Sequence, residues 1–125
     1  MHNIIVISGP SGCGKSTLIH KLLAACPKLR FAVSHTTRPP RDNEICGRDY
    51  HFVSRPLFQK MLKNHEFVEW AEVYGQQYGT SWQELHRKSS KGRTLVLDID
   101  VQGARNIKRQ FPEAMTIFVI PPSLA

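Results

Sequence analysis

The feature that most constrains this chain is a glycine-rich loop at residues 9–17, placed between an apolar run and a helix-forming stretch. It reads Gly-Pro-Ser-Gly-Cys-Gly-Lys-Ser-Thr and fits the pattern G-x-x-x-x-G-K-[ST]. Free N–H groups and the positive end of a helix dipole suit a phosphate chain there. The sequence therefore predicts binding of a nucleoside triphosphate, although a glycine turn that only caps a helix would share part of the pattern. The expected phosphate contacts are Gly9, Ser11, Gly12, Cys13, Gly14, Lys15, Ser16 and Thr17.

Strands and helices are expected to alternate along the chain. The apolar run at residues 4–8 is typical of a central parallel strand. Ser54 and Ser81 are expected helix N-caps, the second in a capping box with Glu84. Further strands are predicted at residues 31–33, 50–53, 67–74, 95–99 and 115–120, helices at 18–26, 54–62, 82 to about 92 and 101–110, and a loop at 34–50. This order predicts an α/β fold with a parallel sheet flanked by helices.

Composition restricts the partners that we expect. The net charge is +7, but the basic residues are scattered, which favours small phosphate ligands over nucleic acid. No stretch is long and apolar enough for a membrane span. Three cysteines without Cys-x-x-Cys spacing predict reduced thiols and a cytoplasmic protein. Ser123 looks like the N-cap of a further helix, so we expect the sequence to be incomplete at its C-terminus.

Two more stretches, taken with the loop, resemble guanylate kinases, which transfer the γ-phosphate of ATP to GMP. They are S-H-T-T-R-P-P-R-D-N-E-I-C-G-R-D-Y-H-F at residues 34–52, and F-V-E-W-A, Y-G-T-S and L-D-I-D-V-Q-G within residues 67–103. The resemblance covers essentially the whole chain. It implies a P-loop core (residues 1–33 and 82–125) with a small mixed β/α GMP-binding region inserted at residues 34–81. It also implies ATP and GMP as substrates, Mg²⁺ as cofactor, and an arginine-bearing lid after residue 125.

The resemblance assigns GMP binding to a set of residues that the chemistry supports. Arg38 and Arg41 have forked guanidinium groups that suit a doubly charged phosphate, although a loop with two arginines could equally be a solvated surface. Tyr50 and Tyr78 can add hydroxyl donors. The implied GMP contacts are Ser34, Arg38, Arg41, Tyr50, Glu69, Tyr78, Thr80 and Asp100, and the implied catalytic residues are Lys15, Arg38 and Arg41.

Glu69 interrupts an apolar stripe. In a regular strand it would share a face with Phe67, Ala71 and Val73, and a buried carboxylate needs a partner. Guanine offers two parallel donors, N1–H and the 2-amino group, whereas adenine lacks the second. A salt bridge to arginine or lysine at the strand end would satisfy the carboxylate equally well.

Asp98 and Asp100 alternate with apolar residues at the carboxyl end of a strand, where open α/β sheets bind ligands. The resemblance suggests that Asp98 serves Mg²⁺, directly or through water and together with Ser16, and that Asp100 serves guanine. Asp100 also has the position of a helix N-cap, which is compatible with either role.

The chemistry would need no general base, because an oxygen of the GMP phosphate attacks and is already ionised. Catalysis would then be in-line positioning and charge neutralisation. Two alternatives stay open: a guanylate-kinase-like binding module or fragment with weak or no activity, and a kinase of another small phosphate acceptor. The intact Lys15 and Ser16 favour an enzyme, and Glu69 with the arginine pair favours GMP.

Overall fold

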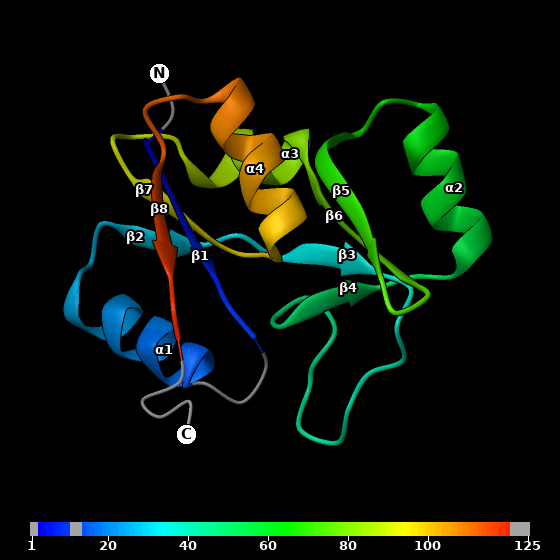
Figure 1. Cartoon of the computed structure of the whole chain (residues 1–125), viewed down its shortest axis with the longest axis horizontal. Helices are drawn as coiled ribbons and strands as arrows, with labels where there is room; N and C mark the ends of the chain where they lie inside the picture. The colour runs from blue at the N-terminus through cyan, green and yellow to red at the C-terminus, as the bar shows by residue number, and fades with distance from the viewer. Residues whose placement is uncertain (1–2, 11–13, 121–125) are drawn as a thin grey trace. The chain divides into compact units, whose positions relative to one another are not determined.

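The computed structural model describes residues 3–10 and 14–120, which divide into two compact units (Figure 1). The first unit is formed by the chain up to Phe31 and from Lys88 onward, and the second by Ala32–Arg87. The first contains β1 (Asn3–Ser8), α1 (Lys15–Ala25), β2 (Leu29–Phe31), β7 (Thr94–Asp98), α4 (Val101–Gln110) and β8 (Met115–Phe118). The second contains β3 (Ser34–Thr36), β4 (Tyr50–Phe52), α2 (Arg55–Lys63), β5 (Phe67–Val73), β6 (Gln76–Ser81) and α3 (Trp82–Lys88).

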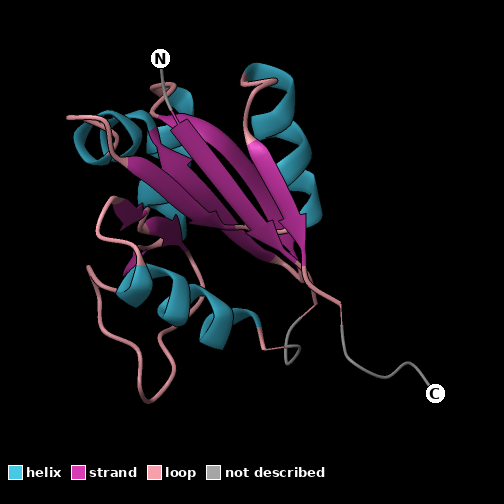
Figure 2. Cartoon of the chain, turned by 90° about the vertical axis from the view of Figure 1, so that its left-hand side faces the viewer, coloured by secondary structure: helices cyan, strands magenta, loops and turns pink. Residues whose placement is uncertain are grey.

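The first unit is built on a parallel sheet of order β2-β7-β1-β8. The connection through α1 leads from β1 toward one edge, and the connection through α4 leads from β7 toward the other. Because parallel crossovers are right-handed, the two helices lie on opposite faces, and Figure 2 shows helices on both sides of the sheet. Ile19 of α1 packs on Ile7 and Val96. The predicted α/β class, with a helix-flanked parallel sheet, is confirmed.

The second unit holds a mixed sheet of order β4-β3-β6-β5. A β-bulge interrupts the pairing of β5 with β6, so that Phe67 pairs with Ser81 but Glu69 pairs with Thr80. Adjacent residues of β6 point to opposite faces, and Phe67 and Glu69 therefore lie on opposite faces as well. The expectation that they share a face was wrong, because the bulge shifts the alternation by one residue.

The two faces of this sheet differ in chemistry. We call the face that carries Ser34, Tyr50, Glu69, Tyr78 and Thr80 the site face. The opposite one, the helix face, carries His35, His51, Phe67 and Gly79 and is where α2 packs.

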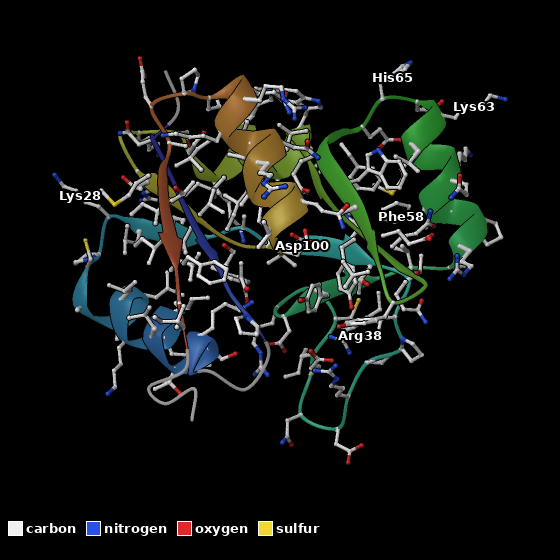
Figure 3. The ribbon with its side chains drawn as sticks, viewed as in Figure 1. Lys28, Arg38, Phe58, Lys63, His65 and Asp100 are labelled. Carbon is white, nitrogen blue, oxygen red and sulfur yellow. The ribbon has the colours of Figure 1, made fainter. Side chains whose placement is uncertain are left out.

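Aromatic rings fill the contact on the helix face. Phe58 of α2 is fully buried and stacks on Phe67 with ring centroids 4.6 Å apart. In Figure 3 Lys63 and His65 point outward at the end of α2. His35 lies 4.6 Å from His51 and 5.8 Å from Phe67. Burial, with a smaller contribution from His51, lowers the pKa of His35 to about 4, so its ring is neutral at pH 7.

Three predicted boundaries were wrong. The strand expected at residues 31–33 is β2 at Leu29–Phe31, and residues 34–36 form β3 instead of a loop. The helix expected to end near Gly92 ends at Lys88. The apolar side chain of Val33 is typical of a strand, and it is buried in the structure. The N–H of Val33, however, donates to the Glu84 carboxylate at 2.7 Å. The expected caps are present: Ser54 Oγ accepts from Leu57 N–H, and Ser81 Oγ accepts from Glu84 N–H.

Gly79 is required by close packing on the helix face. A Cβ at this position would lie 2.8 Å from the Phe67 ring, which Phe58 holds from the other direction. We expect Gly79→Ala to lower the free energy of unfolding by about 1–3 kcal/mol, the usual effect of overpacking. Urea denaturation measures it, with Phe67→Leu and the double variant completing a cycle. A double variant as unstable as the sum of the single ones would contradict the contact.

Candidate functional site

The glycine-rich loop follows β1 at the carboxyl edge of the parallel sheet. There β1 adjoins β7, with Ile7 in register with Asp98, and their connections leave in opposite directions. Such a switch point is where open α/β sheets bind ligands. The helix α1 begins at Lys15, and its N-cap Gly14 has φ 86°. Ser11, Gly12 and Cys13 lie outside the described residues. Ser16 and Thr17 lie exposed in the first turn of α1.

Lys15 and Asp98 come together at this edge although they are far apart in the sequence. Lys15 Nζ lies 3.0 Å from Asp98 Oδ1 and donates a hydrogen bond to the Gly9 carbonyl at 3.2 Å. The lysine ammonium group therefore lies between the Asp98 carboxylate and the Gly9 carbonyl. It is held where a phosphate chain bound by the loop would meet its positive charge.

Gly9 allows the loop to pass close to β8. Its φ is +146°, and a Cβ would lie 2.4 Å from the backbone oxygen of Val119. We expect Gly9→Ala to lower the free energy of unfolding by about 3 kcal/mol, because backbone cannot move aside as a side chain can. At Gly14, with φ +86° and open space, alanine meets only the left-handed strain, about 1–2 kcal/mol. Chemical denaturation compares the two variants, and equal losses would contradict the close approach at Gly9.

Ser16 and Asp98 were predicted as the Mg²⁺ ligands. Hydroxyl and carboxylate oxygens are the donors that this hard cation prefers, and Mg²⁺ at nucleotide sites takes few protein ligands. Within residues 3–10 and 14–120, no three His, Cys, Asp or Glu side chains gather as a metal site. The assignment of Ser16 and Asp98 to Mg²⁺ stays a prediction.

Asp100 is the N-cap of α4. Its Oδ1 accepts a hydrogen bond from Gly103 N–H at 2.9 Å. The reading of this residue as a helix cap is confirmed. Contact of Asp100 with guanine stays a prediction, as does the assignment of Asp98 to the metal.

On the site face, three side chains form a continuous hydrogen-bonded row. Ser34 Oγ lies 2.8 Å from Thr80 Oγ1, and Thr80 Oγ1 donates to Glu69 Oε1 at 3.0 Å. Glu69 is only 6% exposed. The bulge in β5 turns this carboxylate onto the site face, as bulges beside functional sites commonly do. The row fixes the position of the carboxylate on the site face.

Arg38 lies near the start of the long loop between β3 and β4, residues 37–49, which we call the arginine loop (Figure 3). Its Nη1 and Nη2 donate to the two carboxylate oxygens of Glu44 at 2.8 and 2.9 Å. Its guanidinium carbon lies 5.2 Å from the ring centre of Tyr50 and 5.9 Å from that of Phe52. The hydrogen bonds that Arg38 donates to Glu44, and to a lesser extent the contact with the Tyr78 hydroxyl, raise the pKa of Arg38.

Tyr50 of β4 and Tyr78 of β6 lie beside the Arg38 guanidinium, and Arg41 belongs to the same loop as Arg38. Tyr50 and Tyr78 meet edge to face with ring centres 6.0 Å apart. Arg41 is exposed. The sequence interpretation did not include Glu44 or Phe52. The signal available for Phe52 was its spacing of two residues from Tyr50, which places both rings on one face of β4. The signal available for Glu44 was its position as an acidic residue three positions after Arg41.

None of the helices within residues 3–10 and 14–120 has the length and hydropathy needed to cross a membrane.

Comparison with known proteins finds relatives over the whole chain. The sequence model of the guanylate kinase family matches residues 1–125. Guanylate kinase of Thiobacillus denitrificans is 50% identical over 122 residues, which are 98% of this chain and 58% of that protein. Guanylate kinase of Thermosynechococcus vestitus is 48% identical, over 98% of this chain and 64% of the relative.

A solved structure shows the same fold. The crystal structure of guanylate kinase from Anaplasma phagocytophilum matches with a TM-score of 0.84 and 37% identity, covering 98% of this chain and 61% of that one. The chain thus spans about three fifths of the length of these proteins. By the match of the family model over its whole length, and by the identity to these relatives, the chain belongs to the guanylate kinase family.

Proposed function

We propose that this chain carries out, or contributes to, Mg²⁺-dependent transfer of the γ-phosphate of ATP to GMP. The observation that carries the proposal is the buried Glu69 carboxylate, held by Thr80 and Ser34 on the site face. A carboxylate presents two adjacent oxygens, which suits a base that presents two adjacent donors. Guanine has that edge, and adenine, lacking the 2-amino group, would leave an acceptor without a partner.

The phosphate of GMP would be bound by the arginine loop. Arg38 lies over Tyr50 in an ion pair with Glu44, and the exposed Arg41 adds a second guanidinium. A guanidinium binds phosphate oxygens with two parallel hydrogen bonds, which gives both charge and orientation. These groups supply the positioning that phosphoryl transfer needs.

ATP would be bound by the glycine-rich loop of the first unit. Lys15 would leave Asp98 and Gly9 to contact the β- and γ-phosphates, where it neutralises charge that develops during transfer. Ser16 and Asp98 would hold Mg²⁺, which supplies further neutralisation of the phosphate oxygens when bound. The attacking oxygen of GMP is ionised at neutral pH, so the chain's residues need only orient and neutralise.

A non-catalytic binding module is the second candidate. Such a module needs the site face and the arginine loop but has no use for a lysine at a phosphate loop. Here Lys15 lies beside Asp98, and Gly9 and Gly14 both have positive φ. These observations favour the enzyme.

The free thiols Cys26 and Cys46 fit a reducing cytoplasmic location, which we also propose.

The decisive experiment measures ADP release from Mg-ATP by the chain with GMP, with AMP and without an acceptor. Release that depends on GMP and is not produced by AMP establishes the proposed reaction. If none of the three gives ADP, calorimetric titration shows whether the chain binds GMP without turning it over. GMP binding without turnover would identify a binding module, and absence of binding would overturn the guanine assignment of Glu69.

A further inference from the structure

Glu44 occupies the centre of the arginine loop, and neither the sequence motifs nor the proposed reaction gives it a role. Its carboxylate and main chain contact both arginines. Oε1 and Oε2 accept from Arg38, and Oε1 also accepts from the backbone N–H of Arg41 at 2.8 Å. The backbone N–H of Glu44 in turn donates to the Arg41 carbonyl at 2.9 Å. One side chain thus joins the two residues that we expect to bind phosphate.

A count of donors shows which edge of Arg38 the carboxylate occupies. Nη1 donates to Glu44 Oε1 and to the Pro39 carbonyl, so both of its hydrogens are engaged. Nη2 donates one hydrogen to Glu44 Oε2. Glu44 therefore binds the end edge of the guanidinium, between Nη1 and Nη2. The side edge, formed by Nε–H and the second hydrogen of Nη2, has the parallel pair of donors that binds a phosphate with two hydrogen bonds. The Tyr78 hydroxyl, itself an expected phosphate ligand, is the other polar group beside the guanidinium.

The surroundings keep this arrangement in one orientation. The Arg38 and Glu44 side chains are 13% and 19% exposed, so water screens their ion pair less than a surface pair. The hydrogen bonds from Arg38 lower the pKa of Glu44, which stays ionised at neutral pH. The ring of Tyr50 lies under the guanidinium. Rotation of Arg38 about its terminal bonds would break several contacts at once.

We propose that Glu44 is a positioning residue that holds Arg38 by its end edge and Arg41 by its main chain, so that the arginines meet a nucleoside monophosphate in a fixed geometry. This role rests on the proposed function. The opposite role would be a phosphate surrogate, a carboxylate that occupies Arg38 until GMP displaces it. The donor count argues against that role, because Glu44 takes the end edge of Arg38 and not the side edge, where a phosphate would meet the Tyr78 hydroxyl as well.

The test compares Glu44→Ala and Glu44→Gln with Asp42→Asn, which removes one negative charge from an exposed position in the same loop. Calorimetry measures binding of GMP and of guanosine, which lacks the phosphate. We expect Glu44→Ala to weaken GMP about ten- to a hundredfold, the usual effect of losing charge-assisted hydrogen bonds, and to leave guanosine unchanged. Glu44→Gln should lie between, because its amide oxygen can still accept from Arg41. Asp42→Asn should bind GMP like the unmodified chain.

A second measurement does not depend on GMP. In ¹⁵N-resolved NMR of the unliganded chain, we expect separate, slowly exchanging Nη protons of Arg38, which merge in Glu44→Gln and persist in Asp42→Asn. Tighter GMP binding by the Glu44 variants would overturn positioning in favour of the surrogate. Equal weakening of guanosine and GMP, or an unchanged Arg38 spectrum in Glu44→Gln, would also overturn it. Failure of the unmodified chain to bind GMP would overturn the proposed function alone, with the spectrum still deciding the role of Glu44.

Discussion

Lys15→Ala is expected to reduce GMP-dependent ADP release by at least about a hundredfold while GMP binding is retained. Lys15 Nζ contacts the Asp98 carboxylate and the Gly9 carbonyl, and Lys15 is the first residue of α1. Removal of this cation leaves the developing phosphate charge, and Asp98, without their neutralising partner. Apart from Asp100, the residues predicted to bind GMP belong to the other unit of the chain, so the affinity for GMP should change little. Steady-state turnover and calorimetric GMP titration measure the two quantities.

The matched control for this variant is Lys21→Ala. Lys21 is an exposed lysine of the same helix, so its removal changes the net charge equally without touching the loop. We expect it to turn over at the rate of the unmodified chain. Turnover of Lys15→Ala within about threefold of that rate would contradict the phosphate-loop assignment. Parallel loss in both variants would show that net charge, not the position of Lys15, sets the rate.

The parts of this site that depend on local sequence could be predicted. The spacing of Gly9, Gly14 and Lys15 depends on a strand, a turn and a helix that are consecutive in the chain. The alternation of Asp98 with apolar residues placed it at a strand end, and strand ends of a parallel sheet share one edge. The meeting of Lys15 with Asp98 follows from that topology.

The parts that depend on pairing between distant strands could not be predicted. Phe67 and Glu69 are two residues apart and would share a face in any regular strand, yet the bulge separates them. A bulge depends on the partner strand, here Thr80 and Ser81, and leaves no local signal. The strand β3 is three residues long and polar, and only its neighbours β4 and β6 make it a strand. The contact between the Glu44 carboxylate and Arg38 depends on the conformation of a loop, and a loop has no periodic sequence pattern from which that conformation could be predicted.

Glu69→Gln is expected to weaken GMP about ten- to a hundredfold and to leave ATP binding unchanged. The amide oxygen of glutamine can still accept from Thr80 Oγ1, so the row with Ser34 has no reason to break. The amide NH₂, however, would face a donor of guanine instead of accepting from it. Because the side chain is buried, water cannot replace the lost hydrogen bond. Calorimetry with GMP and with ATP measures the difference.

Inosine monophosphate separates base recognition from a general loss of structure. It keeps N1–H but lacks the 2-amino group, so it demands one acceptor where GMP demands two. The Glu69→Gln variant should therefore lose less affinity for inosine monophosphate than for GMP. It should prefer GMP over inosine monophosphate by a smaller factor than the unmodified chain does. Glu72→Gln, an exposed substitution on the same strand, should leave both affinities unchanged. Equal losses for the two nucleotides in Glu69→Gln would mean that Glu69 supports the site face without reading the base, and recognition of guanine would then have to come from other residues.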